Sequence, residues 1–234
     1  MKIRLDKFIS SQLNLTRSDA KKSIKKGLVE VNNTTITDSG FLLESDVDSV
    51  FYNGQAVAYN RYRYIVMNKP KGILSASNDK RRKTVVDLVP NDLSRPNLFP
   101  VGRLDKDTTG LLIITDDGGF AHKVISPKSM IEKAYIAELD GDINEAIIDA
   151  FSKGIVLHDG TPCAPAKLFR LEKNRARVVI TEGKYHQIKR MFGMVNLGVN
   201  SLHRESIGRL KIPEGLNFGD CVEISFTELE SLCL

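Results

Sequence analysis

Four charged residues stand directly before a short apolar run in the middle of the chain. Arg103, Asp105, Lys106 and Asp107 precede Leu111–Ile114, which has a glycine before it and the sequence Asp-Asp-Gly-Gly after it. A short apolar run bounded by turn residues is typical of a strand that is covered on both faces. A rigid strand with charged residues at its mouth is a common way to place one carboxylate accurately. The charge spacing also fits a surface turn with exposed ion pairs, each worth less than about 1 kcal/mol.

A second group of polar residues lies in the segment 182–192, where a strand pattern changes into a helical one. Ile188 and Met191 would share the apolar face of this helix, which leaves Lys189 and Arg190 pointing partly away. A cation there could reach either a phosphate or a buried carboxylate. The alternative is a basic surface helix. The histidine of this segment has no second ligand at metal spacing, so no metal site is predicted.

A tyrosine with two possible roles lies in Lys133–Leu139, which alternates like a strand. Tyr135 would share a face with Lys133 and Ala137. Most such tyrosines are core or edge residues with a satisfied hydroxyl group. An exposed ring at this position could instead stack on a nucleobase.

Basic residues gather in the first 26 positions, which hold eight Lys/Arg and two acids, whereas residues 27–60 hold five acids and no Lys/Arg. Apolar spacing predicts one helix from Leu5 that breaks at Asn14, and Thr16 would cap a second helix that ends at Gly27. The cations of this region are Arg4, Arg17, Lys21, Lys22, Lys25 and Lys26. Like charges on one short helix repel each other, so either solvent screens them or a polyanion neutralises them.

The remaining pattern indicates two domains, at residues 1–60 and 61–234. In the first, Val29–Val31 alternates like a strand, and Asn53-Gly54 is a good hairpin signal. In the second, a strand at Ile65–Met67 leads into a turn at Asn68–Gly72, and the segment 80–83 is predicted to be an exposed basic loop. That loop could be solvated or could contact RNA.

Composition narrows the class of protein. The chain has 234 residues, a hydrophobic content of 41% and a net charge of +5, which raises the expectation of a polyanionic partner. Cys163, Cys221 and Cys233 form no C-x-x-C pair, so neither a disulfide framework nor a zinc site is predicted. The chain lacks a signal-peptide pattern, a membrane-length apolar run and a nucleotide-binding glycine motif. We therefore expect a soluble, cytoplasmic protein with no cofactor.

The N-terminal stretch resembles the αL RNA-binding motif, which is found in a ribosomal small-subunit protein and in several RNA-modifying enzymes. The segments that carry the resemblance are RLDKFI at residues 4–9 and TRSDAKKSIKKGLVEVN at residues 16–32, and the module to which they belong covers about a quarter of the chain. In that family the helix pair grips the RNA backbone, which fits contact between clustered cations and phosphates.

Four further segments are similar to the pseudouridine synthases of the RsuA type, which act on ribosomal RNA. They are NKPKG from Asn68, GRLDKDTTGLLIIT from Gly102, KAY from Lys133 and EGKYHQIKRMF from Glu182. The GRLD segment with its T-x-G-L-L continuation is highly specific. The last segment, followed by LHRESIG from Leu202, is closer to the small-subunit branch than to relatives that act on large-subunit RNA.

The resemblance implies a role for each of four residues. Asp105 matches the family's essential carboxylate, which attacks the ribose C1′ atom or promotes glycal formation. Lys189 matches a cation that pairs with this carboxylate, and Tyr135 matches the ring that stacks on the target uracil. Arg103 could help to flip or replace the base. The neighbouring Lys106 and Asp107 are assigned to ordinary surface charge.

We therefore predict an α+β protein, with an αL-type RNA-binding domain at residues 1–60. The catalytic domain at residues 61–234 would contain a mainly antiparallel mixed sheet flanked by helices. The expected activity is isomerisation of one uridine of small-subunit rRNA by a monomer that needs no cofactor. The substrate is naked RNA or an assembly intermediate, and no membrane partner is expected. The alternatives are the same reaction on large-subunit RNA and a non-catalytic RNA-binding protein of ribosome assembly.

Overall fold

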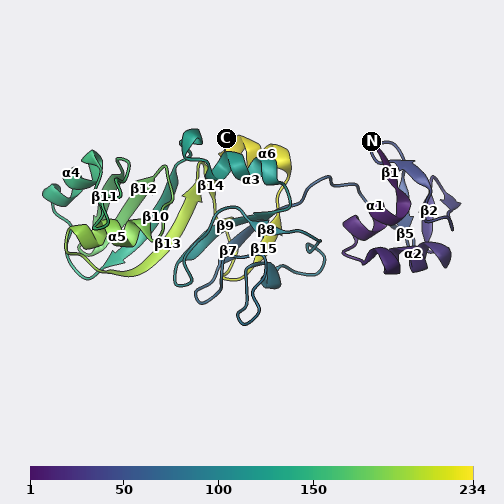
Figure 1. Ribbon diagram of the computed structural model, residues 1–234, viewed down its shortest axis with the longest axis horizontal. Coiled ribbons are helices and arrows are strands. Elements are labelled where there is room, and N and C mark those ends of the chain that lie inside the picture. Colours follow the sequence, from purple (N-terminus) through teal and green to yellow (C-terminus); the bar gives the residue numbers. More distant parts are fainter. Residues whose placement is uncertain (234) are drawn as a thin grey trace. The chain divides into compact units, whose positions relative to one another are not determined.

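The computed structural model describes residues 1–233, which form two compact units (Figure 1). One unit comprises Met1–Arg63 and Pro90–Leu98, and the other contains the rest of the described chain. Short helices accompany mainly antiparallel sheets, so the predicted α+β class is confirmed. None of the described helices is both long and apolar enough to cross a bilayer. The domain boundary at residue 60 stays a prediction.

The first unit packs a helix pair on short strands. Its elements are β1 (Lys2–Arg4), α1 (Leu5–Gln12), α2 (Arg17–Lys25), β2 (Val29–Val31), β3 (Thr34–Thr35), β4 (Leu42–Glu44), β5 (Val50–Tyr52) and β6 (Gln55–Ala56). Asn14 takes a positive φ of 52° after α1, and the side chain of Thr16 accepts the Asp19 amide as the N-cap of α2. Ala20 and Ile24 are the fully buried residues of α2, so its cations lie on the solvent side. The predicted helix pair is confirmed.

The second unit is built on a nine-stranded sheet flanked by four α-helices. The strands are β7 (Tyr64–Lys69), β8 (Phe99–Pro100), β9 (Thr109–Thr115), β10 (Lys133–Leu139), β11 (Lys167–Glu172), β12 (Arg175–Ile180), β13 (Val199–Ile207), β14 (Leu210–Lys211) and β15 (Cys221–Glu223). The α-helices are α3 (Gly118–Ile125), α4 (Glu145–Lys153), α5 (Gln187–Met194) and α6 (Phe226–Cys233). Short 3-10 turns occupy Val86–Leu88 and Pro127–Ser129. The apolar run Leu111–Ile114 lies in β9 and is fully buried, as predicted.

Two halves of this sheet meet at one parallel strand pair. The order is β11-β12-β10-β13-β9-β7-β15, and every neighbouring pair is antiparallel except β13 with β9. In Figure 1, α4 and α5 accompany the β11–β12–β10 half, whereas α3 and α6 accompany the β9–β7–β15 half. The junction therefore brings residues from both halves of the sequence together.

A glycine permits the junction. Gly110 pairs with Arg204 across β9 and β13 and has a φ of +106°. A Cβ atom added there would lie 2.3 Å from the Arg204 carbonyl oxygen, a distance that backbone atoms cannot accept. Glycine is required at this position both for its φ and for the close approach of the two strands.

The structure corrects the predicted turn at Asn68–Gly72. Strand β7 continues through Lys69, and the turn begins only after it. The Lys69 side chain is fully buried, although a lysine beside Pro and Gly suggests an exposed turn. Its ammonium group is stabilised by backbone carbonyl oxygens, which no local sequence pattern reveals.

Candidate active site

The loop between β8 and β9 carries Arg103 and Asp105, and Lys69 holds this loop from inside the protein. Lys69 Nζ donates hydrogen bonds to the carbonyl oxygens of Asp105 at 3.2 Å and Thr108 at 2.9 Å. It also donates to the Pro70 carbonyl oxygen at 3.1 Å. A buried ammonium group is tolerated when several acceptors surround it. The backbone that follows the Asp105 side chain is thereby fixed.

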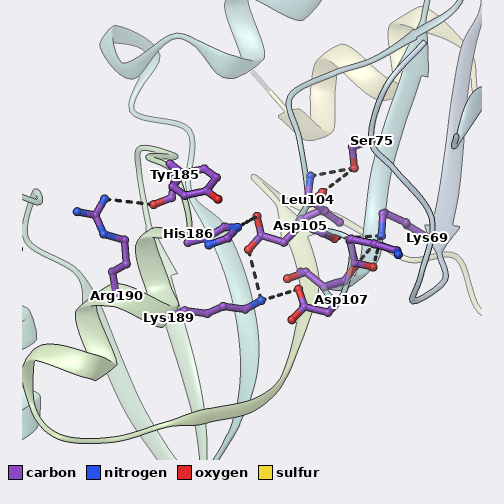
Figure 2. Close-up of polar contacts among 11 residues, drawn as sticks. Lys69, Ser75, Leu104, Asp105, Asp107, Tyr185, His186, Lys189 and Arg190 are labelled. Carbon is purple, nitrogen blue, oxygen red and sulfur yellow. Dashed lines mark hydrogen bonds and ion pairs between the residues drawn. The ribbon is translucent and has the colours of Figure 1, made fainter. Parts of the chain in front are cut away.

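The turn after β7 fixes the same loop at two more points. The Gly72 amide donates to the Lys106 carbonyl oxygen at 2.7 Å. Ser75 Oγ donates to the Leu104 carbonyl oxygen at 2.8 Å and accepts the Leu104 amide at 3.1 Å. The NKPKG segment and the serine that follows it therefore position the loop through its backbone (Figure 2).

Burial lowers the pKa of Lys69 to about 8, and the nearby Asp107 and Asp105 carboxylates only partly oppose this shift. We expect the loop to loosen as the pH rises through this value, because the neutral amine donates fewer hydrogen bonds and loses its charge. Amide hydrogen exchange should report this change as a lower protection factor for Thr108, whose amide donates to the Asp105 carbonyl oxygen. Constant protection between about pH 7 and 9 would contradict the expectation.

Global stability should not fall in the same range. Burial lowers the pKa of Lys133 to about 8 as well. Between this value and the ordinary 10.5 the unfolded chain binds the additional protons, so the contribution of both lysines to the free energy of unfolding rises with pH. The Val101 amide, which donates to Ile113, is the control for loop exchange because Lys69 does not contact it.

Helix α5 brings its cation to the loop from the other half of the sheet. Lys189 Nζ lies 3.5 Å from Asp105 Oδ2 and 2.6 Å from Asp107 Oδ1 (Figure 2). The Lys189 and Asp105 side chains are 23% and 26% exposed, so water screens this pair only in part. The hydrogen bond from Lys189 lowers the pKa of Asp107.

Asp107, which is assigned to ordinary surface charge, has a side chain that is 59% exposed and forms an ion pair with Lys189. Its carboxylate is the nearer partner of Lys189, and together with Asp105 it holds the ammonium group between two acids. The spacing D-x-D could not show which of the two acids lies nearer to Lys189, because their distances from Lys189 depend on the path of the loop. Lys106 remains an exposed side chain that forms no ion pair within residues 1–233.

Tyr135 lies on β10 and is 8% exposed. Its hydroxyl group is 3.5 Å from Nη1 of Arg204, a buried residue of β13 whose Nε donates to the Leu111 carbonyl oxygen at 2.7 Å. Arg204 thus connects the tyrosine with the strand that follows the Asp105 loop. The sequence shows Arg204 as a basic residue of LHRESIG, but it does not show that Arg204 contacts Tyr135.

All four residues for which a catalytic role is predicted line one cavity. Arg103, Asp105, Tyr135 and Lys189 line it, and Arg103 is exposed at its edge. The cavity thus offers one carboxylate, cations beside it and an aromatic ring. That set suits nucleophilic or base catalysis on a planar, polar substrate. The roles of the four residues stay predictions.

A fifth residue of the cavity is missed by the sequence reasoning. His186 Nε2 lies 3.4 Å from Asp105 Oδ1, whereas Lys189 lies near the other carboxylate oxygen (Figure 2). The histidine is adjacent to α5 and has a φ of 49°. A search for metal ligands overlooks it because its partner is a single carboxylate. Its position in the same segment as Lys189 is the sequence feature that could have indicated a place near Asp105.

The N-terminal cations are organised by a buried acid. Asp6 is fully buried, and its carboxylate accepts hydrogen bonds from Arg4 at 3.2 Å and Arg17 at 3.0 Å. Lys21 Nζ lies 3.9 Å away. Burial acts to raise the pKa of Asp6, but the hydrogen bonds from both arginines outweigh it and lower the pKa. Arg4, Arg17 and Lys21 therefore surround one anion.

The other cations of α2 are less constrained. Lys22 pairs with Asp19 at 3.1 Å on the surface, while Lys25 and Lys26 are exposed and form no ion pair within residues 1–233. The basic loop at residues 80–83 is exposed as predicted. Contact of these cations with RNA stays a prediction.

Comparison with known proteins identifies two families in the chain. The RNA pseudouridylate synthase family matches residues 63–193, and the S4 domain family matches residues 3–48. The first match includes Arg103, Asp105, Tyr135 and Lys189.

Relatives align over nearly the whole length. The chain is 36% identical over 234 residues to an uncharacterised RNA pseudouridine synthase of Bacillus subtilis, covering 98% of each chain. It is 36% identical to the ribosomal small subunit pseudouridine synthase A of Haemophilus influenzae, covering 98% of this chain and 99% of the relative. The corresponding Escherichia coli K12 protein is 35% identical, with coverage of 98% and 100%. A crystal structure of a pseudouridylate synthase aligns with a TM-score of 0.69 and 34% identity, covering 98% of this chain and 99% of the other.

Proposed function

Because the chain belongs to the RNA pseudouridylate synthase family, we propose that it converts one uridine of small-subunit (16S) ribosomal RNA to pseudouridine. The convergence of Asp105, Tyr135, Lys189 and Arg103 on one cavity carries this proposal. The small-subunit substrate is inferred from the names of the relatives in Haemophilus influenzae and Escherichia coli. Such a substrate places the enzyme in the cytoplasm. Since one chain supplies the entire cavity, a monomer suffices.

The reaction exchanges one bond to the ribose for another. The bond between C1′ and N1 breaks, the uracil rotates, and a bond forms between C1′ and C5. The proton on C5 leaves and N1 gains one, so substrate and product are isomers and no redox step occurs. Asp105 is the carboxylate that acts at the sugar, either by attacking C1′ or by removing a ribose proton on the glycal route.

The residues around Asp105 supply position and charge. Lys189 and His186 approach its two oxygen atoms from different sides, which orients the carboxylate toward the cavity. The second contact of Lys189, with Asp107, restrains its flexible side chain. Lysine provides a point charge here, so a bidentate pair is not required.

Tyr135 and Arg103 complete the site. Tyr135 lines the cavity, where its ring can stack on the detached uracil, and Arg204 Nη1 lies 3.5 Å from its hydroxyl oxygen. Arg103 lies exposed at the cavity edge, where a guanidinium group can take the place of a base that leaves its helix.

A tritium-release assay tests the proposed reaction. The protein is incubated with small-subunit rRNA that carries tritium at C5 of uridine, and tritium must appear in water at one equivalent per modified site. Mapping of pseudouridine in rRNA from cells that lack the protein then identifies the subunit. If this RNA released no tritium, the proposed reaction would fail. Loss of a large-subunit site in the mapped rRNA would refute the small-subunit assignment.

The exposed lysines of α2 should contribute to RNA affinity. In the triple variant Lys21→Gln, Lys22→Gln and Lys25→Gln, we expect weaker binding and a salt slope that is lower by about 2 to 3. Filter binding or fluorescence anisotropy over a range of salt concentrations measures this slope. An unchanged slope would mean that these lysines form an ordinary solvated helix face.

Asp6 should support RNA binding although it is negatively charged. Asp6→Asn removes the anion that orders Arg4 and Arg17, so both side chains must be ordered when RNA binds. We expect an affinity loss of about 5- to 150-fold, since immobilising two such side chains costs about 1–3 kcal/mol. The matched control is Glu30→Gln, which gives the same charge change at an exposed position of β2. Equal or tighter binding by both variants would refute the ordering role, and circular dichroism verifies folding.

A further inference from the structure

We propose that Tyr185 and His186 form a stacking platform for the unpaired nucleobase next to the target uridine. The two rings stack on each other with centroids 3.8 Å apart and an interplanar angle of 19°. The Tyr185 side chain is 74% exposed, and its two chain neighbours, Lys184 and His186, line the cavity that contains Asp105. This inference rests on the proposed function, because it takes a flipped uridine at Asp105 as its neighbour.

The backbone holds the stacked pair in place. His186 has a left-handed φ of 49°, which is uncommon for a residue other than glycine. Gln187 is buried, accepts the Lys184 amide at 2.9 Å and donates to Glu182 at 2.8 Å. These contacts fix the turn on both sides of Tyr185. The exposed ring is therefore presented by a constrained turn, and stacking on it costs little further ordering.

The platform is continuous with the reacting group. His186 Nε2 lies 3.4 Å from Asp105 Oδ1, and the face of the His186 ring lies against Tyr185 (Figure 2). His186 lines the cavity, whereas Tyr185 lies beyond it toward solvent. An RNA strand that places one base in the cavity has its next base within reach of this ring.

The charges around the platform favour a base rather than a phosphate as the ligand. Lys184 forms an ion pair with Glu182, Arg190 pairs with Asp159 at 2.5 Å, and Lys189 pairs with Asp107. The cations of this segment are thus occupied by carboxylates. The accessible chemistry at Tyr185 is an aromatic face, and every nucleobase offers a π-face to it.

Photo-crosslinking tests the platform without requiring turnover. The probe is a short single-stranded RNA that contains 5-fluorouridine with 5-iodouridine on either side, and it is irradiated with the full-length protein. Mass spectrometry should place a crosslink on Tyr185 in the wild-type protein. The crosslink should disappear in Tyr185→Leu and persist at the corresponding residue of Tyr185→Phe. Wild-type crosslinks that all lie elsewhere would overturn the proposal.

Kinetics supply a second readout. Tyr185→Leu should raise KM about 5- to 50-fold and change kcat less than about 2-fold, because base stacking acts in binding. Tyr185→Phe should retain the wild-type KM. The control is Phe169→Leu, which removes a 47% exposed ring on β11 that does not line the cavity. An unchanged KM in Tyr185→Leu, or an equal rise in Phe169→Leu, would overturn the platform. A crosslink to Tyr185 without tritium release would instead refute the proposed reaction.

Discussion

Replacing Asp105 by asparagine should abolish pseudouridine formation and leave RNA affinity nearly unchanged. The amide has the shape of the carboxylate but can neither attack the ribose nor remove a proton from it. We expect the rate to fall by at least about 10³-fold, as for loss of other reacting groups. The affinity should persist because the proposed RNA contacts lie mainly elsewhere. Tritium release measures the reaction, and anisotropy with the same RNA measures the affinity.

The matched control for this variant is Asp107→Asn. This variant removes one negative charge two residues after Asp105 and keeps the Asp105 carboxylate, which we propose to be the reacting group. The amide oxygen can still accept from Lys189 Nζ at this position, while Asp105 at 3.5 Å remains its charged partner, so measurable activity should remain. Full activity of Asp105→Asn, or equal inactivity of both variants, would sink the assignment of Asp105.

Replacing Lys69 by methionine should have the second largest effect. Methionine fills a similar volume but removes the buried donor. The Asp105 carbonyl oxygen keeps the Thr108 amide, whereas the carbonyl oxygens of Thr108 and Pro70 lose the ammonium group. Unsatisfied buried acceptors should lower the free energy of unfolding by about 2 kcal/mol. The activity should fall by about 10²-fold, because a displacement of about 1 Å at a reacting group has such an effect. Denaturant unfolding and tritium release measure the two quantities.

Lys133→Met separates stability from positioning. Lys133 is also buried, and its Nζ donates to the carbonyl oxygens of Ile131 at 2.9 Å and Val124 at 3.3 Å. It makes none of the contacts that hold the Asp105 loop. We expect a similar loss of stability with a smaller loss of kcat. If both lysine variants lost activity in proportion to stability, Lys69 would be a structural residue without a specific role in placing Asp105.

The local elements could be predicted because their causes are local. Thr16 caps α2 through a residue three positions away, and Asn53-Gly54 takes the positive φ values that a tight hairpin requires. The run Leu111–Ile114 had to be buried on both faces, since it offers no polar alternation. Sheet order is different. It depends on which distant strands pair, and no short pattern specifies that.

The Asp105 site shows the same division. The sequence by itself determined which side chains are available: a carboxylate in GRLD, a tyrosine in KAY and a cation on an amphipathic helix. Only the tertiary structure decided which of them meet. The parallel pairing of β13 with β9 joins the two halves of the sheet, and this junction places Tyr135 and α5 beside the loop that carries Asp105.

The same pairing decided the details that the pattern left open. It placed Asp107 nearer to Lys189 than Asp105 and added His186 to the cavity, whereas the pairing of β7 with β9 buried Lys69 beneath the loop. The physical reason is that helix caps, turns and apolar periodicity act over a few residues. An ion pair or a buried ammonium group depends instead on atoms far apart in the chain, whose distances are set only when the strands have paired.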